Sequence, residues 1–274
     1  MDTLVAESTS RNRDAELLRA PALTQMAIDA HLLARAATAE TVVVRLYQMS
    51  PPAVTIGRHQ KWARLIDEDA CWANGWDWIR RPTGGGALLH KDEINYAVVA
   101  PRSLLAPTGA GEFRAVFELI GQSLSRCLQD LGIDPRLCAG ERATPQAQHG
   151  LCGRSITGNE IAIAGRKLIA AAQLITPTGI LQPGTIYLNA PIPDDRFWPV
   201  SECGTQPVDF EQRWADLHSA VPGRGTEEIV TVLARGLSQY LPAILHTDTP
   251  TDSERAEVAA IVREWVARDW KHSR

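Results

Sequence analysis

The sequence predicts an α/β protein in which helices cover a β-sheet. Short apolar runs bounded by glycine or proline are typical of strands, and longer segments with apolar residues at helical spacing indicate helices. The expected helices are residues 21–38, 62–74, 111–132, 226–240 and 250–270. The expected strands are residues 41–49, 53–56, 76–79, 87–89, 94–100, 161–164, 167–176 and 180–189.

Proline and glycine mark the ends of several of these elements. Pro21 suits the first turn of a helix, and Gly75 suits the residue just after one. The sequence Pro177–Gly179 predicts a hairpin turn, and Pro183 followed by Gly184 is expected to interrupt the strand 180–189. These markers order the chain as a first helix, a set of strands, a long central helix, a β-rich block and two final helices.

The cysteines other than Cys152 give little indication of a catalytic or metal-binding role. Cys127 lies on the apolar stripe of the helix 111–132, so we expect it in the core. Cys71 and Cys138 are expected to be small buried hydrophobic residues as well. The five cysteines form no C-x-x-C pair, which argues against a zinc site or a disulfide framework and favours a reducing cytoplasm.

Length and charge narrow the class of protein. The 274 residues fit a single domain (1–274), with a flexible N-terminus (1–15) and a helical cover (225–274). A net charge of −4 argues against non-specific binding to nucleic acid or anionic lipid. No apolar run reaches the roughly 18 residues that a membrane helix needs. The polar start of the chain lacks a secretory signal, so we expect a cytoplasmic location and no membrane or nucleic-acid partner.

The most informative segment is Arg80–His90, which reads RRPTGGGALLH. Three successive glycines let the main chain adopt positive φ and approach a ligand closely, with amide N–H groups free to face an anion or a carbonyl oxygen. A bare glycine triplet would indicate a flexible hairpin loop, but the flanking arginines and histidine favour a binding loop. The segment is neither a P-loop nor a dinucleotide-binding fingerprint, because neither spacing is present.

Two further segments carry polar groups at turns. Gly57–Gln60 (GRHQ) follows a short strand, and its His59 alone would be interpreted as a surface histidine. Lys167 follows the Gly165–Arg166 turn between two apolar strands. A lysine there is either a surface residue that extends its ammonium into water or a functional ammonium.

Taken in order, three blocks resemble the lipoyl and octanoyl attachment branch of the biotin/lipoate protein ligase superfamily. They are PPAVTIG (51–57), RRPTGGGALLH (80–90) and GRKL through Ala172–Gln173 (165–173). The resemblance covers residues 20 to 270 and implies a mixed β-sheet flanked by helices, of the biotin/lipoyl protein ligase catalytic-domain type. It also implies that an apolar slot holds the acyl chain and that Lys167 is the site lysine. The substrate-binding residues that it implies are Arg81, Thr83, Gly84, Gly85, Gly86, Ala87, His90 and Gly165.

Within this superfamily the chain is most similar to the monomeric cysteine-dependent octanoyltransferases. There, a cysteine precedes the site lysine by a short strand and a turn, and Cys152 precedes Lys167 by 167 − 152 = 15 residues. The resemblance implies transfer of an octanoyl group from acyl carrier protein to Cys152, and then to a lysine of a lipoyl domain or of a glycine-cleavage H-like protein. Lys167 would act as general base and orient the carbonyl group. No cofactor or metal is needed for this reaction.

Two other functions remain open at this point. Gly86 and the GRHQ turn are more typical of a lipoate–protein ligase, which would use ATP, Mg²⁺ and lipoate and act through lipoyl-AMP. The sequence Ala170–Gln173 departs from the usual lysine block, which leaves room for a non-catalytic protein that binds lipoyl domains.

Overall fold

The computed structural model describes residues 17–105, 112–138, 160–190, 214–241, 243–245 and 251–273. Its larger sheet has the strand order β1-β2-β6-β11-β9-β8-β7, with β10 beside β11 and β12 beside β2. Strands β1 and β12 run parallel to β2, while the remaining pairs in this sheet are antiparallel. The larger sheet is therefore mixed, as the resemblance implied. Its strands are β1 (Leu18–Ala20), β2 (Val42–Met49), β6 (Glu93–Pro101), β7 (Arg136–Leu137), β8 (Ile161–Ile163), β9 (Arg166–Ala171), β10 (Leu174–Ile175), β11 (Gly179–Tyr187) and β12 (Ala243–Leu245).

A small second sheet lies beside the first one, with the order β4-β3-β5. It consists of β3 (Ala53–Ile56), β4 (Asp77–Arg80) and β5 (Leu88–His90). The segment between β4 and β5 is the glycine loop, which we define as residues 82–87. The loop therefore joins the two outer strands of this sheet, each of which pairs with β3.

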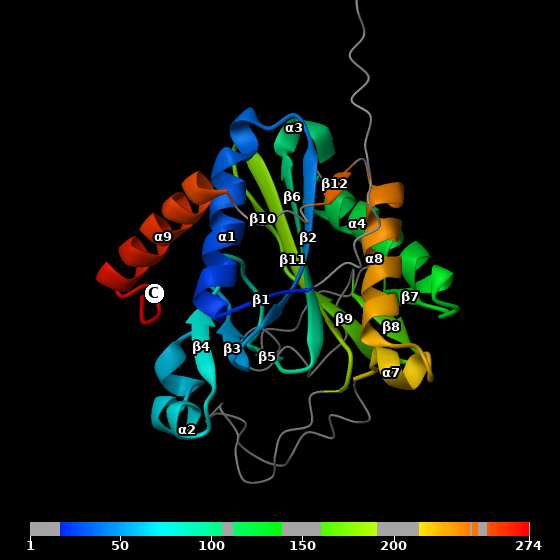
Figure 1. Cartoon of the computed structure of the whole chain (residues 1–274), viewed down its shortest axis with the longest axis horizontal. Helices are drawn as coiled ribbons and strands as arrows, with labels where there is room; N and C mark the ends of the chain where they lie inside the picture. The colour runs from blue at the N-terminus through cyan, green and yellow to red at the C-terminus, as the bar shows by residue number, and fades with distance from the viewer. Residues whose placement is uncertain are drawn as a thin grey trace, which may run out of the picture.

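Helices cover both faces of the larger sheet (Figure 1). The side chains of α4 and α8 pack on one face, against residues such as Val44 and Tyr96. On the opposite face α1 packs against Tyr47 and Val99. The helices are α1 (Ala22–Arg35), η1 (Ala36–Thr38), η2 (Trp62–Arg64), α2 (Glu68–Ala73), α3 (Arg102–Leu105), α4 (Glu112–Asp130), α7 (Leu217–Ala220), α8 (Thr226–Tyr240) and α9 (Asp252–Ala267).

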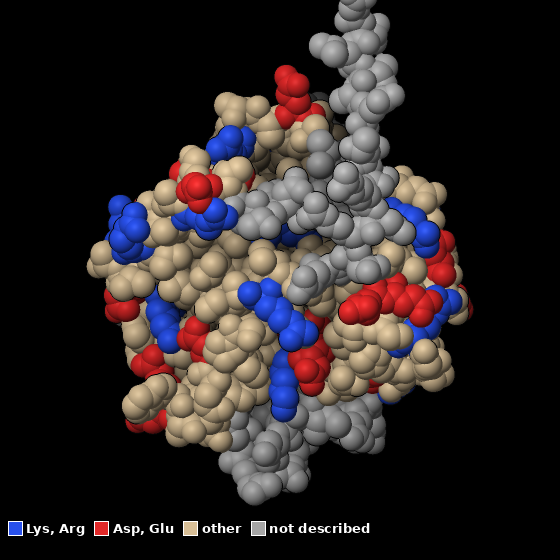
Figure 2. Space-filling model, viewed as in Figure 1, with Lys and Arg blue, Asp and Glu red and all other residues tan. Residues whose placement is uncertain are grey.

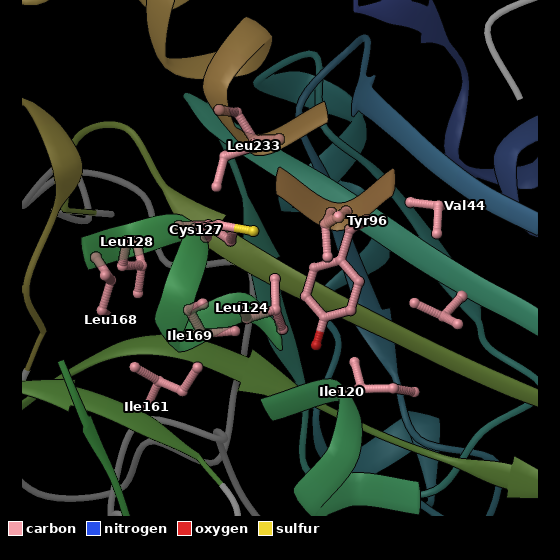
Figure 3. Close-up of a cluster of buried hydrophobic side chains, with 14 of the residues drawn as sticks. Val44, Tyr96, Ile120, Leu124, Cys127, Leu128, Ile161, Leu168, Ile169 and Leu233 are labelled. Carbon is pink, nitrogen blue, oxygen red and sulfur yellow. The ribbon is translucent and has the colours of Figure 1, made fainter. Parts of the chain in front are cut away.

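Strand β6 is buried on both faces because helices lie above and below it. All of its residues are buried, as expected for a strand that is covered on both sides. Successive side chains of β6 point to opposite faces of the sheet and so belong to two different core clusters. Tyr96 and Val98 face α4 and α8, whereas Ala97 and Val99 face α1. Figure 3 shows the first of these clusters, in which Tyr96 lies among the aliphatic side chains of α4, α8 and the sheet.

The final helices differ in what they cover. Helix α8 packs on α4 and on β12 and β2, so it does cover the larger sheet. Helix α9 packs mainly on α1, which leaves it one layer further out than the sequence suggested. Strand β12, which was not predicted, lies between the two helices in the chain and adds a parallel edge to β2.

Three expectations about strands and helices need correction. The segment 62–74 divides into η2 and α2, because the Asp67 side chain caps a new helix by accepting a hydrogen bond from the Ala70 N–H (2.9 Å). The segment 167–176 divides into β9 and β10. Strand β11, in contrast, continues through Pro183.

Pro183 is tolerated inside β11 because its nitrogen, which carries no hydrogen, faces a position where no neighbouring strand needs a donor. The Pro183 carbonyl accepts a hydrogen bond from the Ala172 N–H (3.0 Å), so this side of Pro183 faces the gap between β9 and β10. The N and C=O of one strand residue point to the same side, so no ladder bond from β9 is lost there. On its other side β11 pairs with β6 without interruption.

The charges on the surface are mixed. On the face shown in Figure 2, the Lys and Arg side chains of the described residues lie among Asp and Glu side chains. This face therefore presents no extended surface of one sign, and its long-range attraction for a charged partner is weak. None of the described helices is long and apolar enough to cross a membrane.

Candidate active site

A pocket lies where α1, the larger sheet and the small sheet meet. One part of its wall is apolar and comes from α1, β2, β9 and β11. The other part is polar and comes mainly from the small sheet and the glycine loop. The lining residues are Met26, Tyr47, Met49, Thr55, Arg81, Gly85, Gly86, Leu88, His90, Asn95, Ala170, Ala171, Ala172, Pro183, Gly184 and Thr185. Such a pocket suits an apolar chain with one polar end.

Arg81 holds the glycine loop in place. Its Nε and Nη2 donate to the Gly84 carbonyl (3.1 and 2.6 Å), and Nη2 also donates to the Gly86 carbonyl (2.7 Å). Its Nη1 donates to the carbonyl and hydroxyl oxygens of Thr55 on β3 (3.1 and 3.2 Å). The guanidinium thus ties the loop to the small sheet through one rigid fork of donors.

Gly57 allows the GRHQ turn to touch this loop. A Cβ at Gly57 would lie 2.0 Å from the Gly85 carbonyl oxygen, so only glycine fits. Arg80 secures the turn from beneath by donating to the carbonyls of Gly57, Arg58 and Gln60 (3.1, 3.0 and 2.8 Å). The two adjacent arginines of the motif therefore support two different segments of the same wall.

A chain of hydrogen bonds runs behind the pocket. Asn95 Oδ1 can only accept, so His90 Nδ1 donates to it (3.1 Å), and His90 Nε2 then accepts from the Thr55 hydroxyl (2.9 Å). Asn95 Nδ2 continues the chain by donating to Glu93 Oε1 (2.9 Å). The donors thus run in one direction, from Arg81 through Thr55, His90 and Asn95 to Glu93, and fix the histidine tautomer.

Burial sets the charges along this chain. It lowers the pKa of His90 to about 3, and the nearby Arg81 charge adds to the effect, so the imidazole is neutral at physiological pH. Burial also raises the pKa of Glu93 to about 7, against the opposing hydrogen bond from Asn95. His90 therefore contributes a fixed hydrogen-bond pattern to the pocket wall and no charge.

Lys167 lies on β9, the strand whose residues Ala170 and Ala171 line the pocket. Its ammonium makes an ion pair with Glu160 (Nζ to Oε1, 2.6 Å), and both side chains are almost fully buried, at 2% and 5% exposed. Its Nζ also lies 5.2 Å from the centre of the Trp214 ring. Three residues along a strand span about 10 Å, so Lys167 is within one acyl-chain length of the pocket. This burial excludes the interpretation of Lys167 as a surface residue that extends its ammonium into water.

The structure divides the implied binding residues into two groups. Arg81, Gly85, Gly86 and His90 line the pocket. The other four do not line it, for different reasons. Thr83 is a buried residue of the loop itself, Gly84 turns its carbonyl toward Arg81, Ala87 packs into the core of the small sheet, and Gly165 is exposed at the β8–β9 turn.

Gly165 has a conformational role in that turn. Ala164 and Gly165 both have positive φ (48° and 77°), which is the pattern of a tight two-residue hairpin turn. This turn sets the register that pairs Lys167 with Ala162 of β8. Gly165 thus places Lys167 without reaching the pocket.

Cys152, the implied nucleophile, lies outside the described residues. The cysteines that are described can be placed. Cys127 is buried in the core, as expected, and burial raises the pKa of its thiol to about 12 (Figure 3). Cys71 is also buried, with a pKa raised to about 11 by burial. Cys138 is only half-buried, because it follows the short edge strand β7, so the expectation of a buried Cys138 is wrong.

Several site residues were missed by the sequence analysis. Thr55, Asn95 and Thr185 belong to the polar wall, and Met26 and Met49 to the apolar one. A polar residue inside an apolar strand was the available signal for the first three. The two methionines carried none, because their spacing fits an ordinary core. Among the described residues, no group of His, Cys, Asp or Glu is arranged to hold a metal ion.

We compared the chain with known protein families once the pocket, its glycine loop and the buried lysine had been located. The lipoyl protein ligase A/B catalytic domain matches residues 21–216 of the chain. The chain belongs to this family. The match begins at α1 and ends just after Trp214, so it includes every described residue of the site.

Curated relatives of this lipoyl protein ligase A/B family member are octanoyltransferases. Octanoyltransferase LipM of Kyrpidia tusciae is 28% identical over 259 residues, which cover 90% of this chain and 93% of that protein. Octanoyltransferase LipM of Symbiobacterium thermophilum is 35% identical over 154 residues, or 55% of each chain.

Solved structures of the same family share the fold. Lipoate-protein ligase A bound with ATP superimposes with a TM-score of 0.75 at 21% identity, covering 93% of this chain and 96% of that one. A bipartite lipoate protein ligase from Thermoplasma acidophilum, studied with its E2 lipoyl domain, gives 0.73 at 20% identity, covering 94% and 96%. The predicted fold class, a mixed β-sheet flanked by helices, is confirmed.

Proposed function

We propose that this protein transfers an octanoyl group from acyl carrier protein, through a thioester on Cys152, to a lysine of a lipoyl domain or a glycine-cleavage H-like protein. The class of enzyme predicted from the sequence, an octanoyl- or lipoyl-protein acyltransferase of lipoate metabolism, is confirmed by the octanoyltransferase relatives. The cysteine thioester and the donor are the finer part of the proposal.

One structural observation supports the proposal above the others: an apolar pocket shares strand β9 with a buried, charge-paired lysine. The apolar wall suits a saturated acyl chain, since each buried methylene contributes about 0.8 kcal/mol. The ammonium of Lys167 offers a positive charge to the carbonyl oxygen at the polar end of that chain.

The proposed reaction has two acyl transfers. In the first, the Cys152 thiolate forms a bond to the carbonyl carbon, the bond to the carrier sulfur breaks, and the carrier thiolate takes a proton from solvent. In the second, the neutral amine of the acceptor lysine forms an amide bond, its surplus proton goes to solvent, and the thiolate of Cys152 returns. Neither transfer needs a nucleotide.

The solved structure of the Thermoplasma ligase with its E2 lipoyl domain supports a lipoyl domain as acceptor. It also keeps a second function open. Lipoate-protein ligase A shares the fold and binds ATP, and the third glycine at Gly86 is typical of the ligases. A lipoate–protein ligase would need ATP, Mg²⁺ and lipoate.

The deciding experiment is the intact mass of the purified protein after incubation with octanoyl-acyl carrier protein and no ATP. We expect an added octanoyl mass that hydroxylamine removes. Cys152→Ser should abolish it, while Cys138→Ser, which alters a half-buried thiol, should retain it. The absence of an adduct, combined with lipoyl-AMP formation from ATP and lipoate, would assign the protein to the ligases.

A further inference from the structure

The ion pair between Lys167 and Glu160 is unusual for a lysine at a turn. Both groups are taken out of water, and the separation of 2.6 Å between Nζ and Oε1 is that of a strong charge-assisted hydrogen bond. Burying two charges costs several kcal/mol per ion before their attraction is counted. A pair of this kind is therefore weak evidence for stability and suggests that the charged lysine itself has a use.

The backbone holds both partners of this pair from several sides. The Lys167 carbonyl accepts a hydrogen bond from the Ala215 N–H (2.8 Å), and Glu160 directly precedes β8, with its carbonyl bound to the Cys138 N–H (2.9 Å). Lys167 pairs with Ala162 across the β8–β9 hairpin, and a register shift follows at Ile161. Glu160 lies two residues before Ala162, and its carboxylate reaches the Lys167 ammonium.

Trp214 forms the other side of the lysine's surroundings. Its ring lies 5.2 Å from Nζ, within the range of a cation–π interaction. Tyr187 packs edge-on against the ring (4.8 Å between centroids) and is itself fixed by donating to the Leu89 carbonyl (2.6 Å). The aromatic face is thus supported by the small sheet and cannot easily turn away.

We infer that Glu160 and Trp214 are positioning residues that hold Lys167 as a protonated ammonium, so that it acts on the acyl group as a fixed positive charge and not as a proton acceptor. This inference rests on the proposed function. When a nucleophile adds to the acyl carbonyl, negative charge develops on its oxygen, and a preorganised cation stabilises that charge. No proton passes from the nucleophile to Lys167: the thiol proton leaves to solvent before attack.

The other titratable groups near Lys167 are engaged elsewhere. Tyr187, behind Trp214, donates to the Leu89 carbonyl. Asp216, which follows Ala215, caps α7 by accepting a hydrogen bond from the Ser219 N–H (2.8 Å). Arg166, the neighbour on β9, carries the same sign of charge as Lys167 and so cannot favour the ammonium. Glu160 is the described carboxylate that does so.

A titration by NMR tests the charge of Lys167 without any substrate. The chain has only four lysines, Lys61, Lys91, Lys167 and Lys271, so lysine labelling with Lys167→Arg as the assignment variant resolves each signal. We expect Lys167 to titrate above the usual value of about 10.4, because a paired carboxylate favours the ammonium. In Glu160→Gln the pKa should fall by more than about two units, to about 8 or lower, because burial then acts without compensation.

The pH profile of octanoyl transfer tests the role of that charge. In wild type, kcat should stay high to about pH 9. In Glu160→Gln it should fall at least about tenfold at pH 9 while staying near wild type at pH 6.5, where the lysine is still charged. A merely structural defect would lower kcat equally at both pH values. Glu227→Gln, on the exposed face of α8, is the matched control and should leave the profile unchanged.

Three results would overturn the inference. One is a rise in kcat of Glu160→Gln at pH 9, as expected if neutral Lys167 were the base. Another is an unchanged Lys167 pKa in that variant. If Glu160→Gln does not fold, the wild-type titration decides alone, and a Lys167 pKa below 9 contradicts the proposal. A high Lys167 pKa in a protein without octanoyl transfer would instead refute the proposed function and leave the positioning pair standing.

Discussion

Arg81 uses its donors inside the protein, although an arginine beside a glycine loop first suggests a ligand contact. Every nitrogen of its guanidinium donates a hydrogen bond to Thr55, Gly84 or Gly86. A carbonyl that is pulled toward Arg81 turns the opposite N–H of the same peptide away from it. The arginine therefore determines which amide groups the loop presents to the pocket.

This geometry predicts that Arg81→Lys is not a conservative change. Lysine keeps the charge but lacks the planar fork, so at least two buried carbonyls lose their donor, at about 1–3 kcal/mol of stability each. We expect octanoyl transfer to fall at least tenfold, with a lower melting temperature. Arg235→Lys, on the exposed side of α8, is the control. Wild-type transfer by Arg81→Lys would show that the loop needs no clamp.

The raised pKa of Glu93 leads us to predict that the stability of the protein depends on pH. Burial raises its pKa to about 7, so the folded state binds a proton that the unfolded state has already released above pH 4.5. Its contribution is complete below pH 4.5 and is lost as the pH rises to 7, by about 3 kcal/mol in total. Urea unfolding of Glu93→Gln should lack this part of the pH dependence, whereas the exposed Glu227→Gln should retain it. Equal slopes in wild type and Glu93→Gln would contradict the assignment.

At the scale of elements, two turns depend on glycine for different reasons. Gly165 needs a positive φ, and Gly57 needs the absence of a Cβ against the Gly85 carbonyl. The sequence marks both as turns but does not separate the two reasons, because the Gly57–Gly85 contact joins residues 28 positions apart in the chain.

We therefore predict that Gly57→Ala is strongly destabilising. Its new Cβ would collide with backbone, which cannot move as a side chain can, so the GRHQ turn and the glycine loop must separate. Thermal unfolding should show a loss of at least about 2 kcal/mol. Gly84→Ala is the contrasting variant, since a Cβ at Gly84 meets nothing within 4 Å and its φ is not positive. Equal stability of the two variants would disprove the close contact.

The sequence predicts the helices α1, α4 and α8 and the strands β2, β3 and β6 well, because each carries its own apolar periodicity. It fails for β1 and β12, which are three residues long and exist only through parallel pairing with β2. It also misplaces the effect of Pro183, since the tolerance of that proline depends on a gap between two other strands. Local pattern determines the first group, and tertiary contact determines the second.

The site shows the same division. The glycine loop could be singled out from residue types, and Lys167 from the family resemblance. Gly85 and Gly86 of the loop line the pocket, and Lys167 lies on β9, whose Ala170 and Ala171 line it. Glu160 and Trp214 could not be assigned a role, because the sequence does not show which side chains contact Lys167, and Trp214 is 47 residues from it in the chain. The hydrogen-bond chain from Arg81 to Glu93 likewise depends on two strands of one sheet and one of another, which no spacing in the sequence reveals.

At the scale of the whole molecule, the C-terminal segment 268–273 ties the outer helix α9 to the small sheet. Trp270 Nε1 donates to the Arg80 carbonyl (2.7 Å), Lys271 Nζ lies 4.6 Å from the centre of the Trp78 ring, and His272 bonds to Glu68 (3.0 Å). The segment thus reaches β4, the strand that ends at Arg80, the first arginine of the motif, about 190 residues away in the chain.

This contact predicts that the C-terminal segment supports the glycine loop. Trp270→Phe keeps an aromatic side chain but leaves the buried Arg80 carbonyl without its donor, at about 1–3 kcal/mol. Hydrogen exchange of the amides in β4 and the glycine loop should become faster, with little change in β6. Trp72→Phe is the control, because Trp72 is 86% exposed. Unchanged hydrogen exchange in β4 would show that segment 268–273 packs on the surface without supporting the glycine loop.

The pairing of Lys167 with Glu160 has one more consequence for an enzyme that handles activated acyl groups. An amine attacks a thioester only when it is unprotonated, and by our inference the carboxylate keeps this amine protonated. In the proposed reaction, Lys167 is thereby kept from becoming the recipient of the acyl group. Self-acylation is thus suppressed by the same contact that keeps the charge in place, and the acyl group remains available for the partner protein.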